Sequence, residues 1–174
     1  MVIPPGGSLT TLVPRRLGCN LAAAAIALQP HGCFIDTLSV WSYPLIAIPE
    51  SHVELVSQPH GCVISTVTPD GLVQTTAMWF LYEDGKIKFS LIGHRKKFRN
   101  LQANSACTFF LMNPTNMSNV IEVRGNAVME PDNDKAFVTK VREQYGAEGP
   151  PSDGPADHRF VVTIDPSRIN TIPQ

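Results

Sequence analysis

Four cations stand close together in the middle of the chain. The segment His94-Arg95-Lys96-Lys97-Phe98-Arg99 holds four of the 14 lysine and arginine residues of a 174-residue sequence whose formal net charge is -1. It lies between a run typical of a strand and a run typical of a helix. At such a junction, free backbone N–H groups and the positive end of the helix dipole favour an anion. The cluster therefore predicts a phosphate or carboxylate site, with a solvated basic patch as the alternative.

The spacing within this basic cluster suits a ligand held from two sides. Arg95 and Arg99 are four residues apart and share one face of a helix, whereas Lys97 projects from another side. Ser90 ends the preceding strand-like run, so its hydroxyl can also reach an anion. Residues 74–76, Gln-Thr-Thr, follow a predicted turn and offer donors and acceptors suited to the edge of a heterocycle. Taken alone, they fit the solvent face of an ordinary strand better.

The elements that must position these residues are mostly strands. Short β-branched or alternating runs, separated by turns rich in Pro and Gly, predict strands at 61–67, 72–82, 86–91, 106–112, 120–129 and 158–164. Helical spacing predicts helices at 50–58, 95–103 and 132–145, with a polar loop at 113–119. Asp132 can cap the third helix and Gly146 can end it. Six short strands with short helices between them indicate a β-rich α+β barrel rather than a doubly wound sheet.

Composition narrows the class of protein. A near-neutral chain with a hydrophobic fraction of 43% lacks the basic face that general nucleic-acid or membrane-surface binding requires. The four cysteines form no Cys-x-x-Cys pair, and Cys62 and Cys107 lie in apolar runs where a thiol behaves as a small buried hydrophobe. Reduced thiols predict a cytoplasmic protein. The alternative, export, is suggested by Arg15-Arg16 ahead of an Ala-rich apolar stretch.

Residues 1–48 differ from the rest of the chain. Their only charged side chains are Arg15, Arg16 and Asp36. The opening Pro-Pro-Gly-Gly-Ser is typical of a flexible segment. We therefore expect an irregular, poorly anchored N-terminal extension at residues 1–48 and a main domain at residues 49–174. A translation start set too far upstream would give the same pattern.

One pentapeptide occurs twice, at 29–33 and at 58–62, with the sequence Gln-Pro-His-Gly-Cys. It brings two His and two Cys, which are residue types that suit zinc. A single Gly separates His from Cys in each copy, and this spacing is unlike that of common zinc modules. We therefore predict no metal site. A duplicated helix-to-strand junction or chance can account for the repeat.

Three segments carry a resemblance to a known family. They read Pro-Asp-Gly-x-x-Gln at 69–74, Arg-x-Lys-x-Arg-Asn-Leu at 95–101 and Glu-Val-Arg-Gly at 122–125. In this order and spacing they resemble the pyridoxamine 5′-phosphate oxidase-like split-barrel superfamily, and more narrowly its coenzyme F420 (deazaflavin)-dependent branch. The resemblance runs over about seven-tenths of the chain.

The resemblance implies a homodimer of six-stranded split barrels with two cofactor sites between the subunits. By position, Arg95, Lys97 and Asn100 would hold the phosphate of F420, with Ser90 close by. Gln74, Thr75, Thr76 and Ala77 would line the deazaflavin ring, and Asn119 would reach it from the partner subunit. FMN-binding members carry a cation in the strand that here reads Thr-Thr-Ala-Met-Trp-Phe at 75–80. The absence of that cation favours F420 over FMN.

The implied activity is hydride transfer from reduced F420 to an unsaturated small organic acceptor, and no residue qualifies as a general acid. Two departures bear on the acceptor. Val73 stands where the family often has Pro, and the stretch 116–120 lacks the aromatic residues common in the loop between subunits. The alternatives are an FMN-dependent oxidase, a non-catalytic flavin, deazaflavin or haem carrier, and a dimeric scaffold without a ligand.

Overall fold

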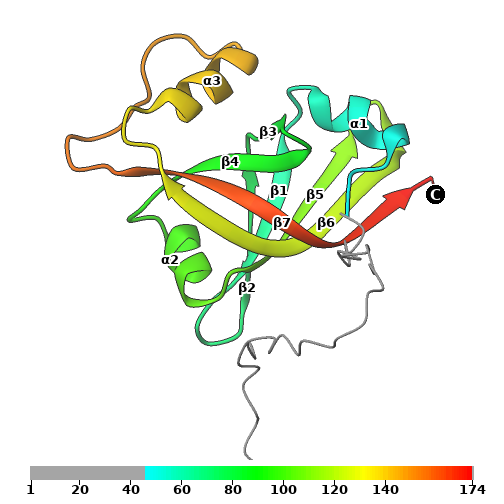
Figure 1. Cartoon of the computed structure of the whole chain (residues 1–174), viewed down its shortest axis with the longest axis horizontal. Helices are drawn as coiled ribbons and strands as arrows, with labels where there is room; N and C mark the ends of the chain where they lie inside the picture. Colours follow the sequence, from blue (N-terminus) through cyan, green and yellow to red (C-terminus); the bar gives the residue numbers. More distant parts are fainter. Residues whose placement is uncertain (1–45, 174) are drawn as a thin grey trace, which may run out of the picture. The chain divides into compact units, whose positions relative to one another are not determined.

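The computed structural model describes residues 46–173, which form a strongly curled antiparallel sheet with three short helices (Figure 1). Most of the predicted extension at residues 1–48 lies outside this range, so the division into extension and domain stays a prediction. The elements in chain order are α1 (Glu50–Ser57), β1 (Cys62–Val67), β2 (Val73–Met78), β3 (Leu81–Glu83), β4 (Lys86–Ile92), α2 (Lys96–Ala103), β5 (Ala106–Asn113), β6 (Asn116–Pro131), α3 (Ala136–Gln144) and β7 (Arg159–Ile172).

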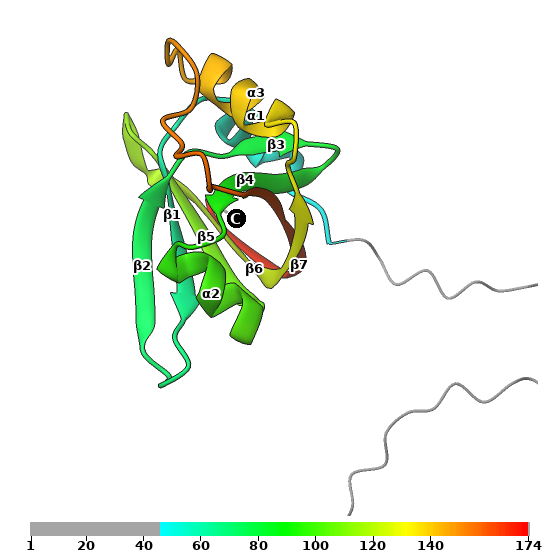
Figure 2. The same cartoon turned by 90° about the vertical axis from the view of Figure 1, so that its left-hand side faces the viewer.

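The seven described strands pair in the order β2-β1-β5-β6-β7-β4-β3, and every pair is antiparallel. Viewed end-on, the sheet curls into an open barrel, with α2 beside β2 and α3 at the opposite end (Figure 2). The β-rich split barrel predicted from the sequence is confirmed. Seven strands replace the six expected, because the predicted strand at 72–82 breaks at Trp79 and Phe80 into β2 and β3. Phe80 is buried there, and its N–H donates to the Tyr145 hydroxyl at 3.3 Å instead of to a strand.

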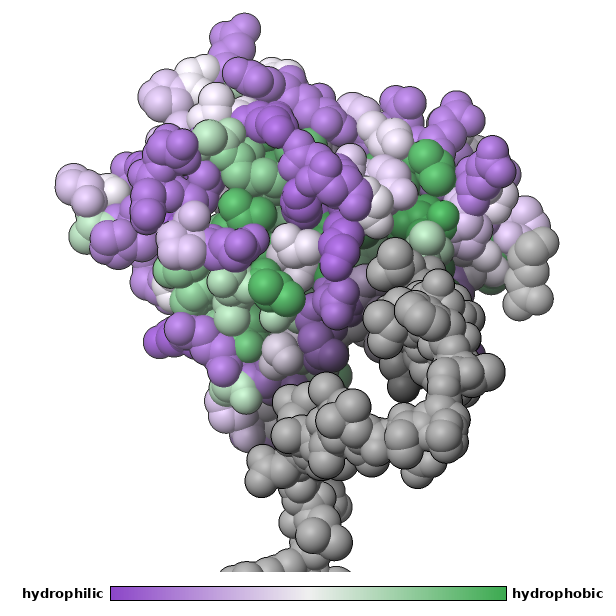
Figure 3. All heavy atoms as spheres, in the orientation of Figure 1, coloured by the Kyte–Doolittle hydropathy of each residue, from purple (hydrophilic) through white to green (hydrophobic). Residues whose placement is uncertain are grey.

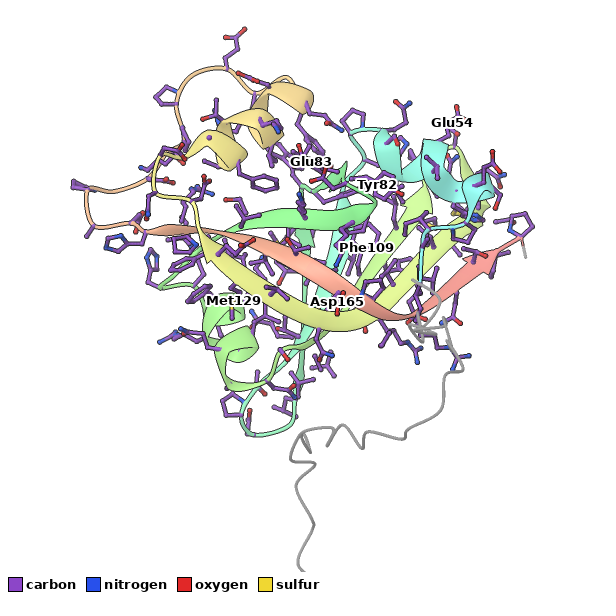
Figure 4. All side chains as sticks on the ribbon, viewed as in Figure 1. Glu54, Tyr82, Glu83, Phe109, Met129 and Asp165 are labelled. Atoms are coloured by element: carbon purple, nitrogen blue, oxygen red, sulfur yellow. The ribbon has the colours of Figure 1, made fainter. Side chains whose placement is uncertain are left out.

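Alternating side chains build the core inside the curl. Ile87, Phe89 and Leu91 of β4 are buried, as their spacing predicts, while the residues between them are partly exposed. Phe109 of β5 lies inside the barrel (Figure 4) and meets the Phe80 ring edge-on, with the ring centroids 4.9 Å apart. Edge-to-face rings of this kind add to the stabilisation that the buried aliphatic side chains provide.

Several predicted boundaries are wrong. The last strand, expected at 158–164, continues to Ile172 as β7, and two other boundaries are wrong for local reasons. The polar loop expected at 113–119 is a two-residue turn, because Asn113 Oδ1 accepts hydrogen bonds from the backbone N–H and the hydroxyl of Thr115. The chain can then extend at once into β6. The third helix begins at Ala136 rather than at 132, although the buried Asp132 carboxylate still caps it by accepting from the N–H groups of Phe137 and Val138 at 3.1 Å.

The apolar side chains at the surface and the thiols in the core are both ordinary for a globular protein. On the face drawn in Figure 3, apolar side chains stand among polar ones and form no continuous apolar surface. Cys62 and Cys107 are free and buried, and burial raises their thiol pKa values to about 12 and about 11. Within residues 46–173, no helix is both long and apolar enough to cross a membrane. The cytoplasmic location stays a prediction.

A bulge lets the longest strands bend. The register between β6 and β7 shifts between Arg124 and Gly125. A Cβ placed on Gly125 would lie 2.1 Å from the carbonyl oxygen of Asp165, so only glycine allows this approach of two backbones.

We predict that Gly125→Ala destabilises the protein by about 1–3 kcal/mol or more, because the backbone of β7 must move to accept the added methyl group. Urea unfolding at fixed pH measures the loss. Gly61→Ala is the matched control, because nothing lies within 4 Å of its added Cβ. Equal stability of the two variants would contradict this account of the bulge.

Candidate functional site

The basic cluster lies where β4 turns into α2. The Arg95 N–H donates to the Ile92 carbonyl at 3.0 Å and closes the turn, and α2 starts at Lys96. No side chain caps the first turn of α2, so its N–H groups remain available. On the other face of α2, Phe98 packs on Phe160 with the ring centroids 4.3 Å apart, which fixes the helix against the barrel.

The cations of the cluster differ in burial. Arg95, Lys96 and Arg99 are exposed, whereas Lys97 is half-buried. Burial lowers the pKa of the Lys97 ammonium and the nearby Arg95 charge lowers it further, while Cys62 acts in the opposite direction. A partly desolvated cation beside a second cation is stabilised when an anion joins it. Lys97 is therefore the residue of the cluster with most to gain from an anionic ligand.

Two cavities adjoin at this cluster, and they share Met78, Ser90, Lys97 and Arg159 in their walls. The first, here called the anion cavity, has a volume of about 420 Å³ and is lined additionally by Gln74, Thr76, Arg95 and Lys96. The second, here called the apolar cavity, has a volume of about 480 Å³ and reaches Ala77, Trp79, Val138 and Val141. Together they are large enough for a cofactor and a small organic molecule.

A buried amide network sets one wall of the anion cavity. The Asn100 side chain is only 2% exposed, and its Nδ2 donates to Thr66 Oγ1 at 3.1 Å and to Gln74 Oε1 at 2.8 Å. Because the Gln74 oxygen is engaged, the amide N–H groups of Gln74 remain as donors toward the cavity. Asn100 thus orients Gln74 from behind.

Trp79, in the wall of the apolar cavity, belongs to a stacked aromatic pair. The Trp79 ring stacks on Tyr145 with centroids 4.8 Å apart and an interplanar angle of 17°. The Tyr145 hydroxyl donates to the His60 carbonyl at 2.6 Å and accepts from Phe80 N–H, so the ring beneath Trp79 is fixed. The indole therefore offers a flat, preformed surface.

Most of the predicted site residues come together, and some do not. Five of them line the anion cavity, namely Gln74, Thr76, Ser90, Arg95 and Lys97. Ala77 lines the apolar cavity, and Asn100 stands behind Gln74. Thr75 lies on the outer face of the sheet, where its hydroxyl is 2.9 Å from that of Ser65. Asn119 lines a different cavity, near the turn between β5 and β6.

One residue of the site could not be predicted from the sequence around it. Arg159, at the start of β7, lines both cavities and donates from Nη1 to Ser90 Oγ at 3.1 Å. It is separated from Ser90 by 69 residues, and only the pairing of β4 with β7 brings the two together. Its other guanidinium edge is bound to Asp153, whose side chain is fully buried.

A zinc site built from the repeated Gln-Pro-His-Gly-Cys segment has no support in the part of the chain that the structure describes. No group of three His, Cys, Asp or Glu side chains in residues 46–173 is placed to hold a metal ion. His31 and Cys33 lie outside that range. His60 and Cys62 serve the fold: the His60 carbonyl binds Tyr145, and the Cys62 side chain is buried in the core.

The fold and site define a split barrel with a basic cavity at a strand-to-helix junction, and comparison with known proteins gives the same class. A family model described as pyridoxamine 5′-phosphate oxidase matches residues 48–172, and the chain belongs to this family. The family belongs to a superfamily that binds flavins or deazaflavins and includes oxidoreductases. No curated protein matches the chain.

Solved structures agree with the fold. A protein named F420 reductase is 32% identical, with a TM-score of 0.64, over 71% of this chain and 98% of its own. A conserved hypothetical protein from Mycobacterium tuberculosis is 21% identical, with a TM-score of 0.60, over 75% and 88% of the two chains. General Stress Protein 26 from Bacillus anthracis is 22% identical, with a TM-score of 0.54, over 68% and 88%. The last two support the fold alone.

We predict an acid-dependent loss of stability that belongs to Asp153. Hydrogen bonds from Arg159 and then from Lys135 lower the pKa of this carboxyl from 3.8 to about 2, against the effect of burial. The ionised Asp153 carboxylate therefore adds to the free energy of unfolding above pH 3.8, and this stabilisation is lost as the pH falls toward 2. Urea unfolding from pH 5 down to about 2 should show a loss in the native protein that is smaller in Asp153→Asn.

Asp165→Asn is the control for Asp153, because Asp165 is largely exposed and pairs only with Lys86 across the barrel surface. It should leave the pH profile close to that of the native protein. Identical profiles for native protein and Asp153→Asn would contradict the assignment.

Proposed function

We propose that the protein is an oxidoreductase that binds reduced coenzyme F420 and transfers a hydride to an unsaturated small organic acceptor. The observation that carries the proposal is the half-buried Lys97 beside Arg95 and the uncapped first turn of α2, opening into a cavity. The 32% identity to a protein named F420 reductase, over nearly all of that protein, favours the deazaflavin.

The residues present fit a phosphate-bearing cofactor. Lys97 and Arg95 supply the charge, the first turn of α2 supplies N–H donors, and Ser90 supplies a hydroxyl. Gln74 presents amide N–H groups suited to a ring carbonyl, because Asn100 occupies its oxygen. When bound, reduced F420 supplies the hydride, and the protein binds, orients and excludes water.

The acceptor fits the apolar cavity best. Trp79 offers a flat indole, and Val138 and Val141 offer an apolar wall from α3. A planar unsaturated molecule would stack there at the side of the anion cavity, which shares Met78 and Lys97 with it.

An FMN-dependent reaction is the second candidate, and the match to the pyridoxamine 5′-phosphate oxidase model favours it. The two are separated by titrating apo-protein with F420 and with FMN and measuring fluorescence. Tight F420 binding without reoxidation by any acceptor would instead support a non-catalytic carrier.

The proposal includes a homodimer. Met112, Val120 and Ile172 are cross-strand neighbours on the outer face of the sheet, and Met112 and Ile172 are 41% and 56% exposed. Asn119 directly precedes Val120 in β6 and lines the cavity beside α1, where its Oδ1 atom is buried with no partner among the described residues. In the proposed dimer a second copy of the chain covers this row. The role of Asn119 at the partner's cofactor stays a prediction.

We predict that Arg95→Ala combined with Lys97→Met weakens F420 binding about a hundredfold or more, because each charge-assisted contact contributes about 1.5–3 kcal/mol. Fluorescence titration measures the change. Arg99→Ala is the matched control, since Arg99 is exposed on the same helix and lines neither cavity. An unchanged affinity in the double variant would refute the site.

We also predict that Met112→Glu converts the dimer to monomer, because it places a charge in the apolar row that the partner would bury. Sedimentation velocity measures the state. Val128→Glu is the control: Val128 is 51% exposed on the same sheet but lies outside the row. A monomeric native protein would refute the dimer directly.

A further inference from the structure

Asp153, Arg159 and Ser90 form one line of hydrogen bonds at the wall that the two cavities share, and Ser90 is 69 residues from Arg159 in the chain. Arg159 donates from Nε and Nη2 to the Asp153 carboxylate, at 2.8 Å and 2.5 Å. It donates from Nη1 to Ser90 Oγ at 3.1 Å. The guanidinium therefore links the loop between α3 and β7 to a hydroxyl of the proposed cofactor site.

The direction of the bond to Ser90 determines what this hydroxyl can do. A guanidinium only donates, whereas a hydroxyl has one proton and two lone pairs. Since Ser90 Oγ accepts from Arg159, the Ser90 proton must point elsewhere. Ser90 makes no second side-chain hydrogen bond among residues 46–173, and both cavities border it. The cavity is the place where an acceptor for this proton can lie.

We propose that Arg159 is a positioning residue for the cofactor site: by donating to Ser90 Oγ, it orients the Ser90 hydroxyl as a donor to an anionic oxygen of the ligand. The oxygen is that of a phosphate or carboxylate, which accepts and does not donate. The inference rests on the proposed function and deepens it, because it assigns a role to a residue far from the basic cluster.

The Asp153 carboxylate restricts the movement of the Arg159 guanidinium. Its side chain is fully buried between the Arg159 guanidinium and the Lys135 ammonium, the latter at 3.3 Å. His94 adds a second tie on the same loop, with Nδ1 2.9 Å from the Asp157 carboxylate. A guanidinium bound on one edge by a buried carboxylate has little freedom to swing into the cavity. The effect of Arg159 on a ligand is therefore expected to pass through Ser90.

A double-mutant cycle on ligand binding tests this role. Ser90→Ala should weaken F420 binding about ten- to a hundredfold, and Arg159→Met should weaken it by a smaller factor, because the Ser90 hydroxyl remains but is no longer oriented. The double variant should bind within about threefold of Ser90→Ala, since Arg159 acts on the ligand only through the hydroxyl that Ser90→Ala has already removed. The deazaflavin ring without its phosphate, used as a second probe, should bind all four proteins within about threefold of one another.

Two further variants control for the fold. Lys135→Met removes the other cation at Asp153 and leaves Arg159 and Ser90 in place, so F420 affinity should be unchanged. If Arg159→Met fails to fold because Asp153 is left uncompensated, Arg159→Met with Asp153→Asn removes both charges and replaces it in the cycle. Thermal unfolding of every variant checks that the fold is intact.

The outcomes are distinct. Independent losses that multiply in the double variant would show that Arg159 contacts the ligand itself and would overturn the positioning role. An equal loss for the phosphate-free ring would overturn it as well, because a general distortion of the cavity would then explain the effect. If the native protein binds neither F420 nor FMN, the proposed function fails, and this inference fails with it. Binding by the native protein without coupling refutes the inference alone.

Discussion

The pairing of β4 with β7 is the constraint on which the rest of the site depends. Five consecutive residue pairs, from Lys88 with Thr163 to Ile92 with Arg159, set the end of β4 beside the start of β7. This pairing places Ser90 next to Arg159 and supports the turn into α2, where Gly93 N–H donates to the His158 carbonyl at 2.9 Å. A Cβ on Gly93 would meet the Phe160 ring at 3.0 Å, so the turn is closely packed on β7. The helix start and its cations are thus held by contacts outside the helix.

The electrostatics of the site follow from this placement. An isolated eight-residue helix is marginal in water, and the Phe98–Phe160 contact is what holds α2 against the barrel. Lys97 is then partly removed from water, which lowers its pKa, while Arg95 stays exposed close by. A ligand anion relieves both the desolvation and the like-charge repulsion. In the proposed site Lys97 is therefore the cation of the cluster that gains most from a bound anion.

Local patterns in the sequence predicted the elements that depend on local physics. The alternation of Ile87, Phe89 and Leu91 predicted β4, and the spacing of Phe98 and Leu101 predicted α2 within one residue. Features that depend on contacts between distant residues were not predicted. The strand breaks at Phe80 because its N–H binds Tyr145. Arg159 reaches the site only through the pairing of β4 with β7. The resemblance to the family placed Thr75 in the site by its position in the sequence. In the structure, strand alternation turns its side chain to the face opposite Gln74 and Thr76.

The two cavities have different parts in the proposed reaction. The anion cavity would hold the anionic group of the cofactor, and the apolar cavity would hold the acceptor. Cations, amides and a hydroxyl line the first, while Trp79 and aliphatic side chains dominate the second. Two titratable groups close to the second, Tyr145 and Cys62, are committed to the fold. Burial raises the pKa of Tyr145 to about 12, and its hydroxyl already donates to the His60 carbonyl. The Cys62 side chain points from β1 into the core, where burial raises its pKa to about 12. Neither is poised to give up a proton near neutral pH. In the proposed reaction the described residues around the cavities would bind and orient the cofactor, and water would supply a proton that the acceptor needs.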